Sequence, residues 1–213
     1  MSQRTVDAVI FDLGGVIMKN GGPRDFTRRY PDHDPAAVAE IVMGPHHLDT
    51  DHQWHRLERG EITMEQCRAI TKEMLDAAGM VATAAPTSGG STFNFQLNEE
   101  MVTFIHDLKS AGLSVGILTN NVKEFREMWW PLMDFESIFD TIVDSHEVKM
   151  RKPNPAIYHL TMDRISAVPQ RTAFLDDLRA NVDAANAVGM HGVWVEEDAS
   201  NAITSARALS GLL

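Results

Sequence analysis

Acidic and polar residues stand directly after three apolar segments of the chain. The first such residue, Asp12, follows the run from Val6 to Phe11 and precedes two glycines, which let a backbone approach a ligand closely. The carboxyl ends of parallel strands lie at one edge of a sheet, and ligands of open α/β folds bind there. We therefore expect the polar residues to converge on one crevice. They are, in chain order, Asp12, Thr119, Asn120, Asp176 and Asp177.

Lys152 adds a cation to this set. It stands just before Pro153 to Pro155, where a helix is predicted to begin, so a lysine and helix N-terminal amides are available to an anion. Clustered carboxylates suit Mg²⁺, which keeps several waters beside a few carboxylates. A metal and a lysine neutralise the non-bridging oxygens of a phosphoryl group while an aspartate attacks phosphorus. The combination indicates phosphoryl transfer.

Each of these residues alone also has a purely structural interpretation. Asp12 is equally well placed to cap a turn, and Thr119 with Asn120 to end a strand. The pair 176–177 is positioned to cap a helix over 181–188, and a lone Lys152 is typical of a solvated surface. Their arrival together at successive strand ends favours a site.

The elements that position the set alternate between strands and helices after residue 98. Such alternation implies parallel strands joined by right-handed crossovers, so the predicted fold class is α/β, a doubly wound, Rossmann-like parallel sheet. Helices are predicted over 98–111, 154–165 and 181–189, and strands over 6–11, 113–121, 139–145, 172–177 and 191–196.

Residues 19–95 have a different sequence pattern, since nothing between 35 and 80 has the alternation expected of a strand. Asp34 is placed to cap a helix that begins at Pro35, and Thr63 with Gln66 resembles a capping box. Small residues over 82–92 predict a loop. We therefore divide the chain into a core domain, 1–18 and 96–213, and a helical insertion over 19–95.

Composition narrows the classes of partner. The 213 residues suffice for one good core plus an insertion, and the net charge of −11 argues against nucleic-acid and anionic membrane surfaces. Cys67 is the only cysteine, which fits a reducing compartment. No apolar run approaches membrane-spanning length and no leader pattern is visible. We expect a cytoplasmic protein, a monomer or homodimer, with no nucleic-acid or membrane partner.

Four motifs in this order resemble those of the haloacid dehalogenase superfamily. They are F-D-L-G-G-V, I-L-T-N-N, K-P-N-P-A-I-Y and F-L-D-D-L-R-A-N. The stretch from Trp54 to Thr63 also resembles the branch that includes the N-terminal phosphatase domain of soluble epoxide hydrolase and a related domain of acyl-CoA dehydrogenase fusions. The resemblance implies that 19–95 is a cap domain that gates the site.

The resemblance also implies roles for the residues. Asp12 becomes the nucleophile and a magnesium ligand. Lys152 and Thr119 become catalytic residues that hold the transferred phosphoryl group of a small phosphorylated metabolite, with Asn120 beside them in substrate binding. The other magnesium ligands implied are Asp176, Asp177 and the backbone carbonyl of Gly14.

Gly14 departs from the family pattern. Phosphatases of this superfamily usually carry an aspartate there, which protonates the leaving alkoxide and then activates water. General acid–base catalysis contributes roughly 10² to 10⁴-fold, so its loss should slow the release of poor leaving groups most. The glycine leaves open a slow phosphatase, an enzyme with another acid, or a phosphate-ester binding protein without turnover.

Other interpretations remain. A 2-haloacid dehalogenase uses the same aspartate without a metal, but a metal-free site has little reason to place two carboxylates beside an anionic substrate. A phosphonate-cleaving relative needs a cap lysine, and only Lys19 and Lys72 lie there, without a motif. The pair His52 and His55 lacks further ligands and is interpreted as polar cap surface. The segment 128–133, M-W-W-P-L-M, is interpreted as packing rather than a partner surface.

Overall fold

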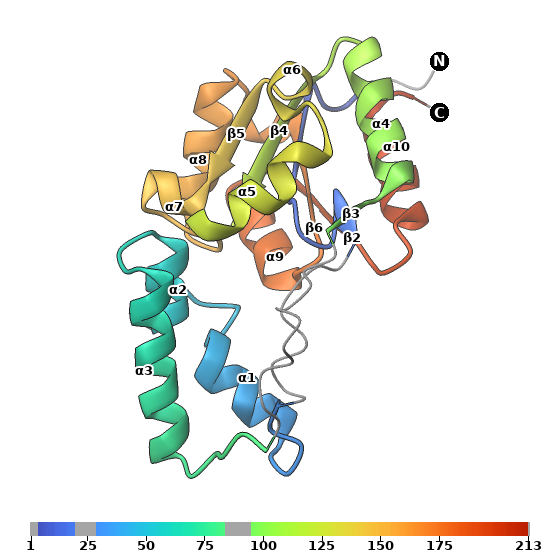
Figure 1. The fold of residues 1–213 in the computed structure, drawn as a ribbon. Helices are drawn as coiled ribbons and strands as arrows, with labels where there is room; N and C mark the ends of the chain where they lie inside the picture. Colours follow the sequence, from blue (N-terminus) through green and yellow to red (C-terminus); the bar gives the residue numbers. More distant parts are fainter. Residues whose placement is uncertain (1–3, 20–28, 84–94, 213) are drawn as a thin grey trace.

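A five-stranded parallel sheet forms the centre of the molecule, in the order β5–β4–β1–β6–β7 (Figure 1). The computed structural model describes residues 4–19, 29–83 and 95–212. The chain thus has the predicted α/β class with a doubly wound parallel sheet. The strands are Ala8–Phe11 (β1), Ser114–Thr119 (β4), Thr141–Asp144 (β5), Thr172–Asp176 (β6) and His191–Trp194 (β7).

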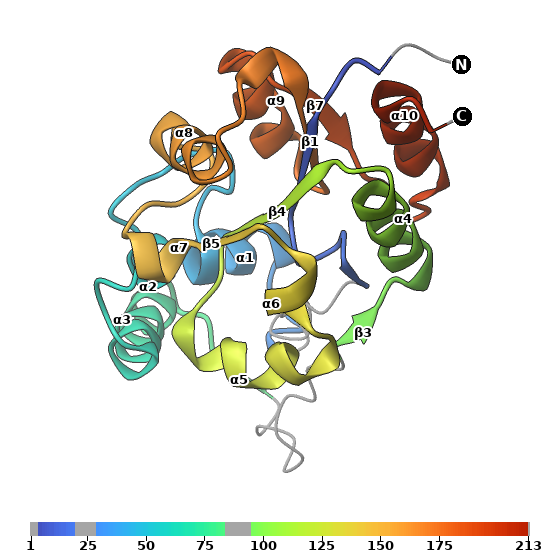
Figure 2. The same ribbon diagram turned by 90° about the horizontal axis from the view of Figure 1, so that it is seen from above.

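Helices cover both faces of this sheet, which explains the unbroken apolar runs of its central strands. Val9 and Phe11 of β1 point into one core, under α4 and α10, while Ile10 points into the other, under α8 and α9 (Figure 2). Successive side chains of a strand alternate between its faces, so β1 is buried on both. The helices are Glu99–Ser110 (α4), Pro155–Arg164 (α8), Arg179–Ala187 (α9) and Ser200–Ser210 (α10).

Short helices lie in the connections between the strands and the longer helices. The segment 128–133 packs as predicted: Trp129 is fully buried, with its ring centroid 5.0 Å from that of Phe135. Met128 lies at the surface. These elements are Lys123–Phe125 (η2), Arg126–Trp129 (α5), Trp130–Leu132 (η3), Phe135–Ile138 (α6), Ser145–Val148 (α7) and Pro169–Arg171 (η4).

Three helices lie to one side of the sheet, with α2 next to α7 (Figure 1). They are Pro35–Met43 (α1), Gln53–Glu58 (α2) and Met64–Ala77 (α3). Asp34 caps α1, and Thr63 with Gln66 forms the predicted capping box. No strand occurs between residues 29 and 83, as predicted. Most of the predicted loop 82–92 lies outside the described residues, and the division into core and cap domains remains a prediction.

Strands Met18–Lys19 (β2) and Gln96–Leu97 (β3) and helix α10 were not predicted. Strand β2 pairs antiparallel with β3, at the expected junction of insertion and core. Two-residue strands carry no periodicity, so the sequence offers no signal for them. Helix α10 was missed because its buried residues are small, Ala202, Ala206 and Ser210, which give a weak apolar pattern. Among the described residues, no helix has the length and apolar character needed to cross a membrane.

Candidate active site

Asp12 stands immediately after β1, where the strand meets the loop of two glycines. Its backbone N–H donates to the carbonyl of Leu175 on β6, at 2.8 Å, and its side chain is buried. Gly15 has a φ of +77°, and a Cβ atom there would lie 2.4 Å from Asp177 Oδ2. Only glycine satisfies both conditions. The glycine loop therefore brings Asp12 and Asp177 to the same edge of the sheet.

Lys152 is 1% exposed, so the interpretation as a solvated surface lysine is wrong. Its Nζ atom lies 2.9 Å from Asp12 Oδ1 and donates to Asp176 Oδ2 at 2.6 Å. The backbone of Lys152 is held as well. Asn120 Oδ1 accepts from its N–H at 2.8 Å, and Asn120 Nδ2 donates to its carbonyl at 2.9 Å. The side chain of Asn120 thus has a positioning role that sequence reasoning did not identify.

Asp176 ends β6 and combines a structural role with its place in the site. Its Oδ1 atom accepts from the backbone N–H of Leu178 at 2.8 Å, at the N-cap of α9. Asn181 Nδ2 lies 3.1 Å from both carboxylate oxygens. The capping interpretation is therefore correct in part. Asn181 was missed as a partner of Asp176, although it is the first residue of the helix predicted over 181–189.

The carboxylates of Asp12, Asp176 and Asp177 each offer an oxygen atom within 4.8 Å of the others. Such an all-oxygen donor set suits a hard divalent cation and offers no soft ligand for a metal such as zinc or copper. Mutual repulsion of three carboxylates is a cost that a cation would relieve. The residues that the structure brings together therefore fit Mg²⁺.

Burial and the neighbouring charges displace two pKa values in the site. Burial raises the pKa of Asp12 to about 7, against the attraction of Lys152, and Asp176 adds to the increase. Burial alone would lower the pKa of Lys152, but the two carboxylates beside it raise the value on balance. Lys152 therefore keeps its charge at neutral pH, and a cation near Asp12 would favour its anionic form.

A pocket opens beside these residues. Gly14 and Thr119 line one side of it, and a Cβ atom on Gly14 would meet nothing within 4 Å. Thr119, the last residue of β4, is buried. The pocket wall is largely apolar and includes residues from the insertion. Its apolar lining consists of Met18, Met43, Trp54, Phe95, Val122 and Phe125.

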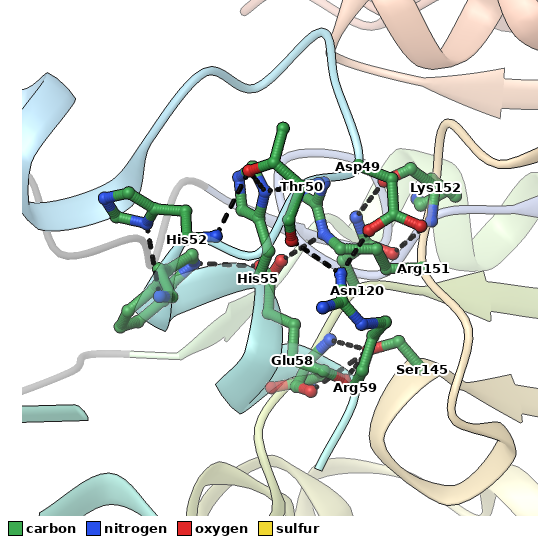
Figure 3. A network of polar contacts seen from close by, with 12 residues as sticks. Asp49, Thr50, His52, His55, Glu58, Arg59, Asn120, Ser145, Arg151 and Lys152 are labelled. Carbon is green, nitrogen blue, oxygen red and sulfur yellow. Dashed lines mark hydrogen bonds and ion pairs between the residues drawn. The ribbon is translucent and has the colours of Figure 1, made fainter. Parts of the chain in front are cut away.

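Buried polar residues connect the insertion to the loop that carries Lys152 (Figure 3). Glu58 of α2 also lines the pocket and pairs with Arg151 at 2.7 Å. Sequence reasoning missed both residues because nothing in the spacing links positions so far apart.

His55 is fully buried, so its interpretation as polar cap surface is wrong. Its Nδ1 atom accepts from the backbone N–H of Thr50 at 3.2 Å.

The sequence profile of the haloacid dehalogenase-like hydrolases matches residues 63–195. Mouse acyl-CoA dehydrogenase family member 10 is 30% identical over 98% of this chain, but the chain spans only 19% of that protein. Sesquiterpene phosphatase astK of Aspergillus oryzae is 28% identical over 91% of each chain. Mouse bifunctional epoxide hydrolase 2 is 32% identical over 89% of this chain and 36% of its own length.

Among solved structures, a haloacid dehalogenase family enzyme from Bacteroides thetaiotaomicron has the same fold. It superposes with a TM-score of 0.64 at 17% identity, covering 91% of this chain and 96% of the other. That enzyme was solved in complex with magnesium and inorganic phosphate. This likeness shows the shared fold, and the sequence profile with the sequence relatives supports the predicted resemblance.

Proposed function

The chain belongs to the haloacid dehalogenase-like hydrolases, and from this premise we propose that it is a Mg²⁺-dependent phosphatase of phosphate monoesters. The observation that carries the proposal is the buried Asp12 carboxylate, which faces Lys152 and lies beside Asp176 and Asp177. An anionic nucleophile, a fixed cation and a metal-fitting set of oxygens are the requirements of phosphoryl transfer through an aspartyl phosphate.

In the first step an Asp12 oxygen forms a bond to phosphorus, and the bond between phosphorus and the ester oxygen breaks. The leaving alkoxide takes its proton from water, because position 14 offers no acid. Lys152 and Thr119 hold the non-bridging oxygens of the phosphoryl group. In the second step a water oxygen bonds to phosphorus and the bond between phosphorus and the Asp12 oxygen breaks. The proton released from this water neutralises the hydroxide left by the first step, and the products are phosphate and the Asp12 carboxylate.

The residues proposed to hold Mg²⁺ are Asp12, Asp176, Asp177 and the backbone carbonyl of Gly14. Bound there, the ion supplies neutralising charge to the transferred phosphoryl oxygens. Asp176 is oriented for this role by the N–H of Leu178 and the amide of Asn181. Asp177 lies against Gly15, whose lack of a Cβ atom admits its carboxylate.

The leaving group is proposed to be apolar. Six apolar residues line the pocket beside Gly14, and three of them, Trp54, Phe95 and Phe125, are aromatic. Burying an apolar leaving group against them gains about 25 cal/mol per Å² of apolar surface. One relative of similar length is named as a sesquiterpene phosphatase, which agrees with an apolar ester. In this proposal residues 19–95 act as the cap that supplies part of this wall.

A dehalogenase would use the same Asp12 on a carbon–halogen bond. The three clustered carboxylates argue against it, because a carboxylate substrate would meet them without a metal to offset their charge. We also keep the non-catalytic alternative, a phosphate-ester binding protein, because of Gly14. Retention of Asp12 and Lys152 in direct contact favours an enzyme over it.

The test is phosphate release from p-nitrophenyl phosphate and from alkyl phosphates, with and without Mg²⁺, by the parent chain and by Asp12→Asn. Magnesium-dependent release that is lost in the variant is the expected result. Release that is independent of Mg²⁺, or unchanged in Asp12→Asn, would contradict the proposal. Turnover of 2-chloropropionate in place of any phosphate ester would support the dehalogenase.

A further inference from the structure

We propose that Glu58 and Arg151 are positioning residues that tie the leaving-group pocket to Lys152. The proposal rests on the proposed function and extends it, because here the insertion sets the position of the lysine proposed to bind phosphate. Its basis is a buried ion pair that joins α2 to the residue preceding Lys152 in the chain.

The ion pair joins parts of the chain that are 93 residues apart. Arg151 Nε donates to Glu58 Oε2 at 2.7 Å, and the two side chains are 3% and 10% exposed. Arg151 Nη1 also donates to the carbonyl of Leu48, at 2.5 Å. Arg151 thus points away from the sheet into the insertion, while the next residue, Lys152, points back toward Asp12. A displacement of Arg151 is transmitted to Lys152 through their shared peptide bond.

Further contacts hold the same two segments together (Figure 3). Ser145 Oγ donates to the carbonyl of Glu58 at 2.6 Å, and Lys149 Nζ donates to that of Gly60 at 2.8 Å. On the far side of Lys152, Asn154 Nδ2 lies 3.3 Å from Asp49 Oδ2. Residues 48–60 therefore bind the loop that carries Lys152 through contacts on both sides of the lysine.

The other carboxylate oxygen of Glu58 is hydrogen-bonded to a residue of the pocket. Trp54 Nε1 donates to Glu58 Oε1 at 2.9 Å, and both residues line the pocket beside Gly14. A leaving group that packs on Trp54 therefore stabilises the Glu58 geometry that Arg151 needs. Binding energy from the non-reacting part of the substrate is in this way used to set Lys152, which holds the reacting part.

The backbone of Lys152 is also fixed by hydrogen bonds from the core, independently of the Glu58–Arg151 pair. The amide of Asn120 bonds to its backbone N–H and carbonyl, so loss of the Glu58–Arg151 pair should displace the lysine rather than release it. A small displacement is still costly, because a hydrogen bond from the ammonium group to phosphate weakens steeply as its distance and angle depart from the optimum. We therefore expect weaker phosphate binding, with Asp12 chemistry retained.

The test compares Arg151→Met, Glu58→Gln and Trp54→Phe with the parent chain, in the presence of Mg²⁺. Three quantities are measured: the Kd of inorganic phosphate by calorimetry, and KM and kcat both for p-nitrophenyl phosphate and for an ester with a larger apolar leaving group. Arg151→Met is expected to raise the phosphate Kd and KM by about tenfold, which corresponds to a loss of about 1.4 kcal/mol of binding free energy. Trp54→Phe keeps the apolar wall but removes the N–H donor, and is expected to raise KM for esters with large leaving groups only.

The matched control is Arg207→Met, which removes an ion pair with Asp107 between α10 and α4, remote from the pocket. It is expected to lower Tm but to leave the phosphate Kd and KM at parent values. In the double variant Glu58→Gln/Arg151→Met the effect should not exceed that of Arg151→Met alone, because the two residues act as one unit. Where Arg151→Met does not fold, Arg151→Lys takes its place.

Folded variants with the parent's phosphate Kd and KM would overturn the positioning role. Additive effects in the double variant would overturn the coupling between the two residues. Failure of the proposed function is distinguishable, because it would show as no phosphate release by the parent chain, while the phosphate Kd still reports whether Glu58 and Arg151 set Lys152.

Discussion

Lys152 Nζ lies 2.9 Å from Asp12 Oδ1, and both side chains are buried. The proposed nucleophile and the cation that is proposed to hold the phosphoryl group are thus in direct contact before substrate arrives. A third partner, Asp176, receives a hydrogen bond from the same ammonium group. The lysine therefore has one structural role, offsetting the repulsion among the carboxylates, and one proposed role, binding phosphate, and the two should respond differently to substitution.

Lys152→Met should lower both stability and activity. Removing one partner of a buried ion pair typically costs about 3–5 kcal/mol, because the remaining charges stay buried without compensation. Added Mg²⁺ should restore part of this stability in the variant but none of its phosphate affinity. Thermal unfolding with and without Mg²⁺, together with the Kd of inorganic phosphate, checks this. A variant with parent-like phosphate affinity would contradict the role of Lys152.

Gly14→Asp should raise the turnover of alkyl phosphates. A Cβ atom at position 14 would meet nothing within 4 Å, and Gly14 is not among the glycines with positive φ, so the site accepts the side chain. A restored general acid should give about 10²-fold for alkyl esters and much less for aryl esters, whose leaving groups need no proton. Rates for paired alkyl and aryl substrates measure this ratio.

Gly15→Ala serves as the control for that experiment. Its Cβ atom would lie 2.4 Å from Asp177 Oδ2 at a φ of +77°, so we expect weaker Mg²⁺ binding and lower activity on every ester. An unchanged ratio of alkyl to aryl rates in a folded, magnesium-binding Gly14→Asp variant would count against the account of position 14.

The site residues could be predicted because strand ends are local features. Asp12 and Asp176 each follow an apolar run, and the parallel topology brings such positions together without any knowledge of packing. The Glu58–Arg151 pair could not be predicted in this way, since it depends on how the insertion docks onto the loop before Lys152. For the same reason the sequence did not reveal that His55 is buried.

The burial of His55 predicts a loss of stability in acid. Burial, with Arg151 nearby, lowers its pKa to about 3, against an unfolded value of 6.5. Between these values the unfolded chain binds a proton that the folded chain does not, so stability falls as pH decreases from 6.5, by up to about 1.4 kcal/mol per pH unit.

His55→Asn should remove this slope, because an asparagine oxygen can accept the hydrogen bond from Thr50 without titrating in this range. Urea unfolding of parent and variant at pH values from 7 to 4 measures the difference. Parallel stability curves for the two proteins would show that His55 is not the group responsible.

Magnesium should stabilise the folded chain, because the unfolded chain does not assemble the three carboxylates. At a concentration of a hundred times Kd, the expected gain is about 2.7 kcal/mol. Asp177→Asn should reduce the gain, whereas Asp183→Asn, at an exposed position on α9, should not. Thermal unfolding across a magnesium titration distinguishes them. Equal gains in both variants would remove Asp177 from the proposed metal site.

Catalysis through Asp12 requires a covalent aspartyl phosphate, which can be detected directly. With an aryl phosphate the first step needs no acid, while the second lacks a base at position 14, so the aspartyl phosphate should accumulate during turnover. We would quench the reaction of p-nitrophenyl phosphate in acid and analyse the peptides by mass spectrometry. We expect one added phosphoryl group on the peptide that contains Asp12, absent in Asp12→Asn. Phosphate release with that peptide unmodified, or with the phosphoryl group on another residue, would contradict it.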